Sequence, residues 1–257
     1  MSGKLQVEYI DHIAVITIDN PPANTWDRNS LTALTSLIDE LNGKRDIYSL
    51  IVTGSGDKYF SAGADLKMFV DGDKGSAWAI SSLFGQAFGA LSRFRGVSIA
   101  ALNGYAVGGG LECALACDIR IAEEQVLVAL PEAKVGLLPC GGGTQRLLNL
   151  AGEGWTKRLI LCGEQLSASQ AHAVGIIEEV VGRHEAMPKA LEMARNVAKQ
   201  SPSSVAACKS LIQESRVLLE KGLLLERERF VELFDTEDQT EGVNAFLEKR
   251  APHWKNA

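Results

Sequence analysis

Two short turns of similar sequence constrain this chain most strongly. One has the sequence Phe60-Ser-Ala-Gly-Ala-Asp-Leu66 and the other Asn103-Gly-Tyr-Ala-Val-Gly-Gly-Gly-Leu-Glu112. Each follows an apolar run typical of a buried strand, at 50–53 and at 99–102, and each leads into a helix-like segment. Small residues at such a turn leave backbone N–H groups free, and the helix behind adds partial positive charge. Two such turns can direct two amides at one developing negative oxygen, which would form an oxyanion hole.

The composition is that of an ordinary globular protein. The chain has 257 residues, 46% hydrophobic and 23% charged, which is enough for one large domain or two small ones. Its net charge of −6 and its pI of about 5.4 argue against general nucleic-acid binding, which usually requires a basic surface. A local basic patch for a phosphorylated small molecule remains open.

The cysteines indicate a reducing compartment. Their number is odd, and their spacing is not that of a disulfide framework. Cys113 and Cys117 share a helix face, but no histidine lies near them, so we expect buried core residues and no metal site. The five cysteines are Cys113, Cys117, Cys140, Cys162 and Cys208.

Neither a secretion signal nor a membrane span is expected. The first residues, Met-Ser-Gly-Lys-Leu-Gln-Val-Glu, do not combine a basic start with an apolar run. The apolar stretch 97–121 is interrupted by Asn103, Glu112, Asp118 and four glycines, which favours a buried strand followed by a buried helix. We therefore predict a cytoplasmic protein.

Strands and helices alternate in the first part of the chain. Residues 4–18 predict a hairpin with its turn at Asp11-His12, and the apolar stripe from Leu31 to Leu41 predicts a helix capped by Asn29 or Ser30. Asp65 is a candidate cap for a short helix. Further strands are predicted at 49–53, 98–102, 119–122 and 126–130, and further helices at 76–94 and 110–117.

The second part becomes helical. A third glycine-rich turn, Pro139-Cys-Gly-Gly-Gly-Thr144, precedes it. We predict an α/β core with the active site over residues 1–190 and a helical part over 191–257 that serves in oligomerisation. The sequence itself shows no clear repeat, although the strand–turn–helix unit recurs. The predicted helices cover 145–150, 155–161, 167–172, 186–200, 203–220, 222–234 and 239–248.

Two backbone amides and two carboxylates are the candidate chemical groups. The amides of Ala64 and Gly109 are placed to hold a carbonyl oxygen, although the glycines alone would also be explained by tight turns. Glu112 either stabilises a helix N-terminus or lines a cleft; its apolar neighbours and the lack of a cation within four residues favour the cleft. Glu132 follows a buried strand, where open α/β sheets build sites, or it pairs with Lys134.

Other chemistries have little support. The third turn offers a free amide near Cys140 that can hold a water, but no histidine or lysine beside Cys140 would activate its thiol. The sequence has no phosphate-binding P-loop motif, no dinucleotide-binding G-x-G-x-x-G at the usual place and no G-x-S-x-G elbow. Its four histidines show no metal-binding spacing.

The chain resembles the crotonase superfamily, and within it the enoyl-CoA hydratases, from about residue 5 to 254. The resemblance rests on the two turns above together with several shorter pieces. These pieces are Cys117-Asp118, Pro131-Glu132, Gly136-Leu-Leu-Pro139, Gly143-Thr-Gln-Arg-Leu147 and the tail from Phe234 to Trp254.

This resemblance implies a fold, an assembly and a substrate. The fold would be a spiral of repeated ββα units with a helical C-terminal part, assembled as trimers that pair into hexamers. The substrate would be an acyl-CoA thioester, its carbonyl oxygen between the amides of Ala64 and Gly109. Residues Ala62, Ala64, Asp65 and Leu66 would bind the CoA part, and Cys140 would lie beside the reacting water.

It also implies a reaction. Glu112 and Glu132 match the two hydratase carboxylates: Glu112 would be the general base for a water that adds to the β-carbon of a trans-2-enoyl-CoA, and Glu132 the general acid that protonates the α-carbon. Two close carboxylates are not both ionised, so one shared proton suits this division. No cofactor, metal, nucleic acid or membrane would take part. Fatty-acid β-oxidation, amino-acid degradation and aromatic degradation all use such chemistry.

Two departures and two alternatives stay open. The family often has Gly-Ala-Gly-Gly-Thr where this chain has Cys140-Gly-Gly-Gly-Thr144, which narrows the pocket beside the water, and Asn24-Thr-Trp26 replaces a basic residue or leucine. A double-bond isomerase is the alternative within the family, but its members often keep one carboxylate. A non-catalytic acyl-CoA-binding or RNA-binding protein is the other, and the acidic pI and the intact carboxylates weigh against it.

Overall fold

The fold is built on two sheets of mainly parallel strands. The computed structural model describes residues 3–69, 74–214, 237–238, 241, 245, 248 and 250–255. The larger sheet has the order β1-β2-β3-β5-β7-β10, in which β1 and β2 form an antiparallel hairpin and the other neighbours are parallel. Its strands are β1 (Leu5–Ile10), β2 (Ile13–Ile18), β3 (Ser49–Gly54), β5 (Val97–Leu102), β7 (Ile119–Glu123) and β10 (Glu179–Val181).

The smaller sheet has four short strands, of which β4, β6 and β8 follow the same order as β3, β5 and β7 of the larger sheet. Its order is β4-β6-β8-β9, parallel except for the β8–β9 pair. Three residues per strand leave too short a pattern for sequence periodicity, so β4, β6 and β9 were not predicted. The strands are β4 (Tyr59–Ser61), β6 (Tyr105–Val107), β8 (Leu127–Ala129) and β9 (Gln165–Ser167).

Three successive ββα units generate the spiral. In each, one strand joins the larger sheet, the next joins the smaller sheet, and a helix follows: β3-β4-α2, β5-β6-α3 and β7-β8-α4. The ββα spiral that the resemblance implied is thus present. The helices are α1 (Arg28–Gly43), α2 (Lys74–Ser92), α3 (Gly109–Ala116), α4 (Gly143–Leu161), α5 (Ala168–Ala173), α6 (Ala186–Val197) and α7 (Pro202–Glu214), with 3-10 turns η1 (Leu66–Phe69) and η2 (Glu132–Val135).

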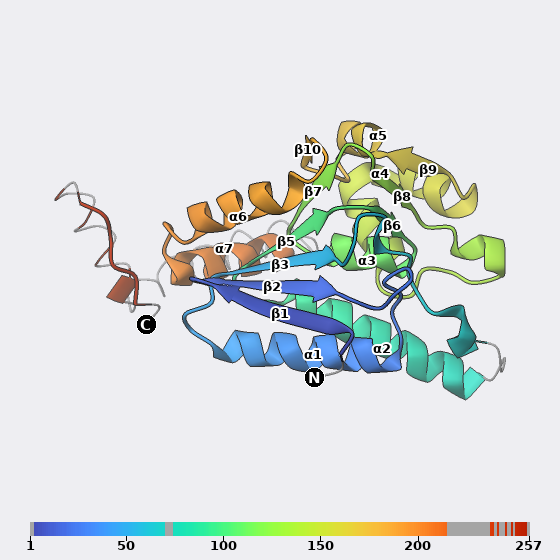
Figure 1. The fold of residues 1–257 in the computed structure, drawn as a ribbon, viewed down its shortest axis with the longest axis horizontal. Helices are drawn as coiled ribbons and strands as arrows, with labels where there is room; N and C mark the ends of the chain where they lie inside the picture. Colours follow the sequence, from blue (N-terminus) through green and yellow to red (C-terminus); the bar gives the residue numbers. More distant parts are fainter. Residues whose placement is uncertain are drawn as a thin grey trace.

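Helices cover the larger sheet on both faces (Figure 1). Helices α1 and α2 lie along one side and α6 and α7 along the other. Side chains alternate across a strand, so Ile13 and Val15 of β2 pack in the cluster with α6, while Ala14 and Ile16 pack in the main core. Burial on both faces explains why β2 and β3 are continuous apolar runs.

Two predicted helix boundaries are corrected. Helix α1 is capped by Asp27, not by Asn29 or Ser30: the Asp27 carboxylate accepts the Ser30 N–H, and the Ser30 hydroxyl accepts the Asp27 N–H. The helices predicted at 145–150 and 155–161 are the two halves of α4, which is interrupted at Gly152, where φ is 74°.

The C-terminal part is described only partly. Helix α6 ends at Val197, three residues before its predicted end, and it crosses the predicted boundary at residue 190 to pack against the larger sheet. The helix predicted at 222–234, most of the one at 239–248 and the last residues of the one at 203–220 lie outside the described residues. The division at residue 190 stays a prediction. In the part described, no helix has both the length and the apolar character needed to cross a membrane.

Candidate active site

A cavity of about 320 Å³ lies where the three glycine-rich turns meet. The second strands of the ββα units bring these turns together, because β4, β6 and β8 are neighbours and each ends at this edge of the smaller sheet. The cavity is lined by Ala62, Gly63, Ala64, Leu66, Phe69, Phe84, Val107, Gly108, Gly109, Glu112, Pro131, Glu132, Lys134, Val135, Leu137, Leu138 and Cys140.

The first turn presents the amide of Ala64. Ala64 forms a parallel bridge with Trp26, in which the Trp26 N–H donates to Gly63 O at 2.8 Å and the Asp65 N–H donates to Trp26 O at 2.8 Å. Because successive groups of an extended chain point to opposite sides, the Ala64 N–H faces away from Trp26. Among the residues that the structure describes, no acceptor is recorded for this N–H.

The second turn presents the amide of Gly109. Gly109 is the first residue of α3, and the first N–H groups of a helix have no partner within it. The first turn contacts the second so closely that residue 63 must be glycine: an added Cβ at Gly63 would lie 2.8 Å from Val107 O and 3.0 Å from Gly109 N. The two candidate amides therefore belong to turns that pack directly on each other.

Glu112 is buried and held by the third turn. Its side chain is 2% exposed, and its Oε1 accepts the N–H groups of Gly141 and Gly143, each at 2.8 Å. Burial raises the pKa of Glu112, while the hydrogen bonds from Gly143 and Gly141 and the positive charge of Arg146 oppose this rise. The amides and the cation stabilise the ionised form, so Glu112 is suited to accept a proton.

Glu132 lies in a different environment. It begins η2, and its Oε2 is buried without a hydrogen-bond partner in the described part of the chain. Burial, and then the negative charge of Glu112, raise the pKa of Glu132 to about 7. The pairing with Lys134 that the sequence left open is absent from the described ion pairs; Lys134 instead lies against Gly163. Glu132 is suited to hold a proton near neutral pH.

Cys140 is half-buried at the cavity wall. Burial, and then the charges of Glu112 and Glu132, raise the pKa of its thiol to about 12. A thiol that stays protonated is a poor nucleophile, as its sequence neighbours already indicated. Cys113 and Cys117 are buried in the core, as predicted.

The cavity collects all but one of the residues predicted for the site. Asp65 is the exception: its carboxylate accepts the Lys67 N–H at 3.1 Å at the start of η1. The predicted short-helix cap is therefore present, and a role for Asp65 in binding stays a prediction. The residues that line the cavity are Ala62, Ala64, Leu66, Gly109, Glu112, Glu132 and Cys140.

Several residues at the site were not predicted. The amides of Gly141 and Gly143 contact Glu112 across 29 and 31 positions of sequence, and the only signal for this was the triple glycine itself. Phe84 approaches Gly109 and Phe88 approaches Gly141, each so closely that an added Cβ would lie within 2.9 Å of the ring. Both phenylalanines belong to the helix predicted at 76–94.

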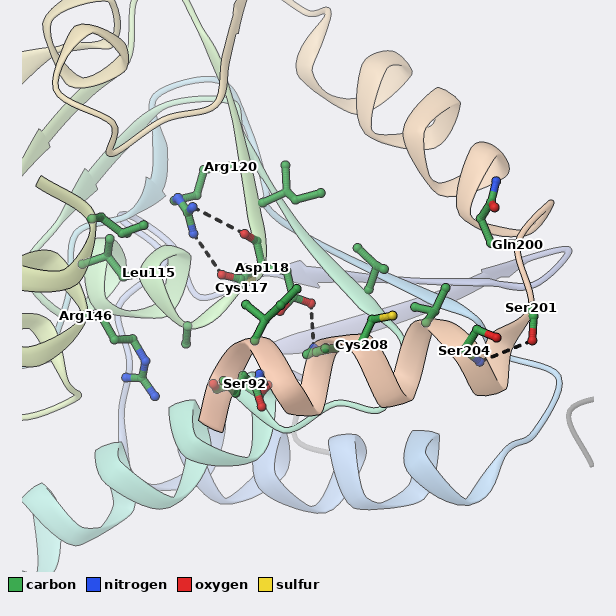
Figure 2. A pocket seen from close by; sticks show the side chains of 18 of the residues that line it. Ser92, Leu115, Cys117, Asp118, Arg120, Arg146, Gln200, Ser201, Ser204 and Cys208 are labelled. Carbon is green, nitrogen blue, oxygen red and sulfur yellow. Dashed lines mark hydrogen bonds and ion pairs between the residues drawn. The ribbon is translucent and has the colours of Figure 1, made fainter. Parts of the chain in front are cut away.

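A larger cavity of about 670 Å³ lies elsewhere and contains none of the predicted site residues. Figure 2 shows α7, with Ser204 and Cys208, on one side of it, and Leu115, Cys117 and Asp118 on the other. Three of its charged groups are in ion pairs: Lys209 donates to Asp118 at 2.6 Å, and Arg120 pairs with Glu178. The described residues contain no group of three or more His, Cys, Asp or Glu side chains that could hold a metal ion.

Comparison with known proteins identifies the family. The model of the family described as enoyl-CoA hydratase/isomerase matches residues 8–257. A solved structure of Pseudomonas aeruginosa DspI is 60% identical, with a TM-score of 0.97, covering 99% of this chain and 97% of that one. A Bacillus anthracis enoyl-CoA hydratase structure is 35% identical, with a TM-score of 0.95, covering 99% of this chain and all of that one (100%). The 2,3-dehydroadipyl-CoA hydratase of Escherichia coli strain K12 is 35% identical over 98% of this chain and 99% of that protein. The chain therefore belongs to the enoyl-CoA hydratase/isomerase family.

Proposed function

We propose that this protein is an enoyl-CoA hydratase, which adds water syn across the 2,3 double bond of a trans-2-enoyl-CoA to give a 3-hydroxyacyl-CoA. One observation carries the proposal: a carboxylate held by two amides and a carboxyl with a pKa of about 7 line the same cavity as two available amides. A hydration needs a base, an acid and an oxyanion site together. An isomerisation that moves one proton needs only one carboxyl group.

The proposed reaction assigns each group one step. Glu112 takes a proton from the water as the water oxygen bonds to C3. The π electrons of the C2–C3 double bond move toward the thioester oxygen, where the Ala64 and Gly109 amides stabilise the enolate charge. Glu132 then gives its proton to C2, and the thioester carbonyl re-forms. The proton now on Glu112 returns to Glu132 by exchange with solvent, so the net change is addition of one water.

The substrate contacts follow the same proposal. The thioester oxygen would lie between the amides of Ala64 and Gly109, and residues Ala62 to Leu66 would bind the CoA part. The apolar lining contributed by Phe69, Phe84 and Val135 suits an acyl group. No cofactor beyond the CoA of the substrate is required.

The test is the hydration of a short trans-2-enoyl-CoA, followed by loss of its conjugated thioester absorbance. Wild type is compared with Glu112→Gln and Glu132→Gln, whose folding is checked by circular dichroism and thermal unfolding. We expect wild-type turnover and a loss of roughly 10²–10⁴-fold in kcat for each variant, the usual contribution of a positioned acid or base. Wild-type binding without hydration, but with migration of a 3-enoyl double bond, would identify an isomerase instead. Failure to bind any acyl-CoA would overturn the proposal.

We further propose that the protein is cytoplasmic and assembles as trimers that pair into hexamers; the assembly is what the family resemblance implies. Sedimentation equilibrium would give three or six times the chain mass of 27.6 kDa. A monomer or dimer at micromolar concentration would contradict this.

A further inference from the structure

Arg146 donates a hydrogen bond to the turn that holds Glu112. From the first part of α4 its Nη1 donates to Gly141 O at 2.6 Å, and its Nη2 donates to Phe88 O at 3.3 Å. The N–H of the same Gly141 donates to Glu112 Oε1 at 2.8 Å. Gly141 is therefore fixed on one side by Arg146 and on the other side holds Glu112.

The backbone of the turn is shaped for this guanidinium. Gly142 has a φ of 106°, and the position of a Cβ there is occupied by Nη1 of Arg146. The backbone N–H of Arg146 donates in turn to Gly142 O at 2.9 Å. A side chain at residue 142 would displace the guanidinium, so the glycine is explained by both its conformation and the close approach of Arg146.

The positive charge of Arg146 also interacts with the carboxylate of Glu112. The titratable groups that interact with Glu112 are Glu132 from η2, Cys140 from the turn and Arg146 from α4. Among these described groups, Arg146 supplies the positive charge. It lowers the pKa of Glu112, against the rise that burial causes.

We propose that Arg146 is a positioning residue of the active site: it fixes Gly141 so that the Gly141 and Gly143 amides hold Glu112, and its charge stabilises the Glu112 carboxylate. The catalytic consequence rests on the proposed hydratase function, whereas the effect on Glu112 does not. A residue that only tied α4 to α2 would change stability and leave the ionisation of Glu112 as it is.

Three variants separate these roles. Arg146→Gln removes the charge, Arg146→Lys keeps the charge but not the two-pronged donor, and Arg158→Gln removes a cation from an exposed ion pair on the same helix as a control. For each variant, kcat/KM is measured across pH with a short trans-2-enoyl-CoA. Thermal unfolding and mass in solution establish that the fold and assembly are retained.

We expect the acid limb of the pH profile to move to higher pH in Arg146→Gln, because more Glu112 is then protonated at low pH. On that limb, kcat/KM should fall by about tenfold or more relative to wild type, as expected for loss of a nearby opposite charge. Arg146→Lys should keep the wild-type limb but lose part of kcat, and Arg158→Gln should match wild type throughout. An equal loss at every pH in folded Arg146→Gln would overturn the electrostatic part of the proposal. If Arg146→Gln does not fold, a displaced acid limb in Arg146→Lys would do the same.

A second measurement does not depend on turnover. Infrared spectra of protein with ¹³C-labelled glutamate are recorded across pH, and Glu112→Gln identifies the Glu112 carboxyl band. In Arg146→Gln this band should convert to carboxylate at higher pH than in wild type and in Arg146→Lys. The same midpoint in all three proteins would overturn the proposal. If wild type hydrates no enoyl-CoA, the hydratase function fails, and this titration still decides the role of Arg146.

Discussion

The two glutamates of the cavity have the same side chain and opposite environments. Glu112 is almost fully buried, yet two backbone amides hold one of its oxygens and a guanidinium lies behind the turn. Glu132 is less buried, yet one of its oxygens has no hydrogen-bond partner among the described residues, and its pKa is raised to about 7. The two glutamates therefore differ more in the hydrogen-bond and charge partners of their carboxyl groups than in their depth of burial.

Under the proposed function, this difference explains how one cavity would hold an acid and a base at the same pH. Burial alone raises the pKa of any carboxyl group, so two buried glutamates without partners would both be protonated. Donors directed at only one of them stabilise its ionised form, and its charge then favours the proton on the other. The donors come from the third glycine-rich turn. That turn is therefore as important to the proposed chemistry as the two turns that present the Ala64 and Gly109 amides.

The largest effect is expected from shortening each glutamate by one methylene. Glu112→Asp cannot reach the Gly141 and Gly143 amides without moving the turn, so we expect kcat/KM to fall by roughly 10²–10³-fold. Glu132→Asp has no fixed hydrogen bond at Oε2 to lose, and we expect a loss of about tenfold. Both are measured by hydration of a short trans-2-enoyl-CoA at the pH optimum. Equal losses would show that the amide contacts of Glu112 do not matter for the reaction.

A smaller effect is expected from crowding the turn. In Gly141→Ala the new methyl group would lie 2.6 Å from Phe88 Cδ2 and 2.9 Å from Glu112 Oε2, so the ring or the carboxylate must move. We expect kcat/KM to fall by about 10- to 100-fold, because a displacement of about 1 Å at a catalytic group has an effect of that size. Adding Phe88→Leu should recover part of the loss. Gly43→Ala, where nothing lies within 4 Å of the new methyl group, is the control.

The sequence predicts the local part of this arrangement and misses the part that depends on distant contacts. The first two turns were recognisable because each is a short continuous pattern between a strand and a helix. The neighbours of Glu112 and Glu132 marked both as candidates, and the family resemblance supplied their roles as base and acid. The hold on Glu112 was not predictable in the same way, because Gly141 and Arg146 reach it only after β7, β8 and η2 have returned the chain to the cavity. Within four residues of Glu112 the sequence has no cation.

The secondary structure follows the same division. The long amphipathic helices α1 and α2 and the hairpin of β1 and β2 lie close to their predicted positions, because each has enough residues to show its period. The three-residue strands β4, β6 and β9 exist because a neighbouring strand completes their hydrogen bonds. The Asp27 cap was missed because the apolar stripe begins only at Leu31, four residues further on.

The raised pKa of Glu132 also predicts that a variant with lower activity, Glu132→Gln, is more stable than wild type at neutral and higher pH. The folded-state pKa of Glu132, about 7, lies above its ordinary value of 4.5, so the folded state binds the proton more tightly than the unfolded state. Stability should therefore decrease as pH rises from about 4.5 through about 7. Glu132→Gln removes this effect, and above pH 7 it should be more stable than wild type by about 1–2 kcal/mol, allowing for partial exposure. Glu112→Gln should gain less, because the Glu112 carboxylate already has donors. Thermal unfolding across pH measures both, and a Glu132→Gln advantage that persists at pH 4 would contradict this assignment.

The smallest effect is expected at Cys140, the residue that shares the cavity wall with both glutamates. The negative charges of Glu112 and Glu132 both disfavour ionisation of the Cys140 thiol. Together with burial, they raise the pKa of Cys140 to about 12. We therefore expect Cys140→Ala to change kcat/KM by no more than about threefold with a short substrate, since the thiol is not a nucleophile. Iodoacetamide at mildly alkaline pH should modify the exposed Cys162 and Cys208 well before Cys140, as peptide mass spectrometry would show. The contrary result would be rapid alkylation of Cys140 with loss of turnover, together with the same loss of turnover in Cys140→Ala. That result would place a thiolate in the reaction, and the two carboxyl groups alone would then not account for the chemistry of the cavity.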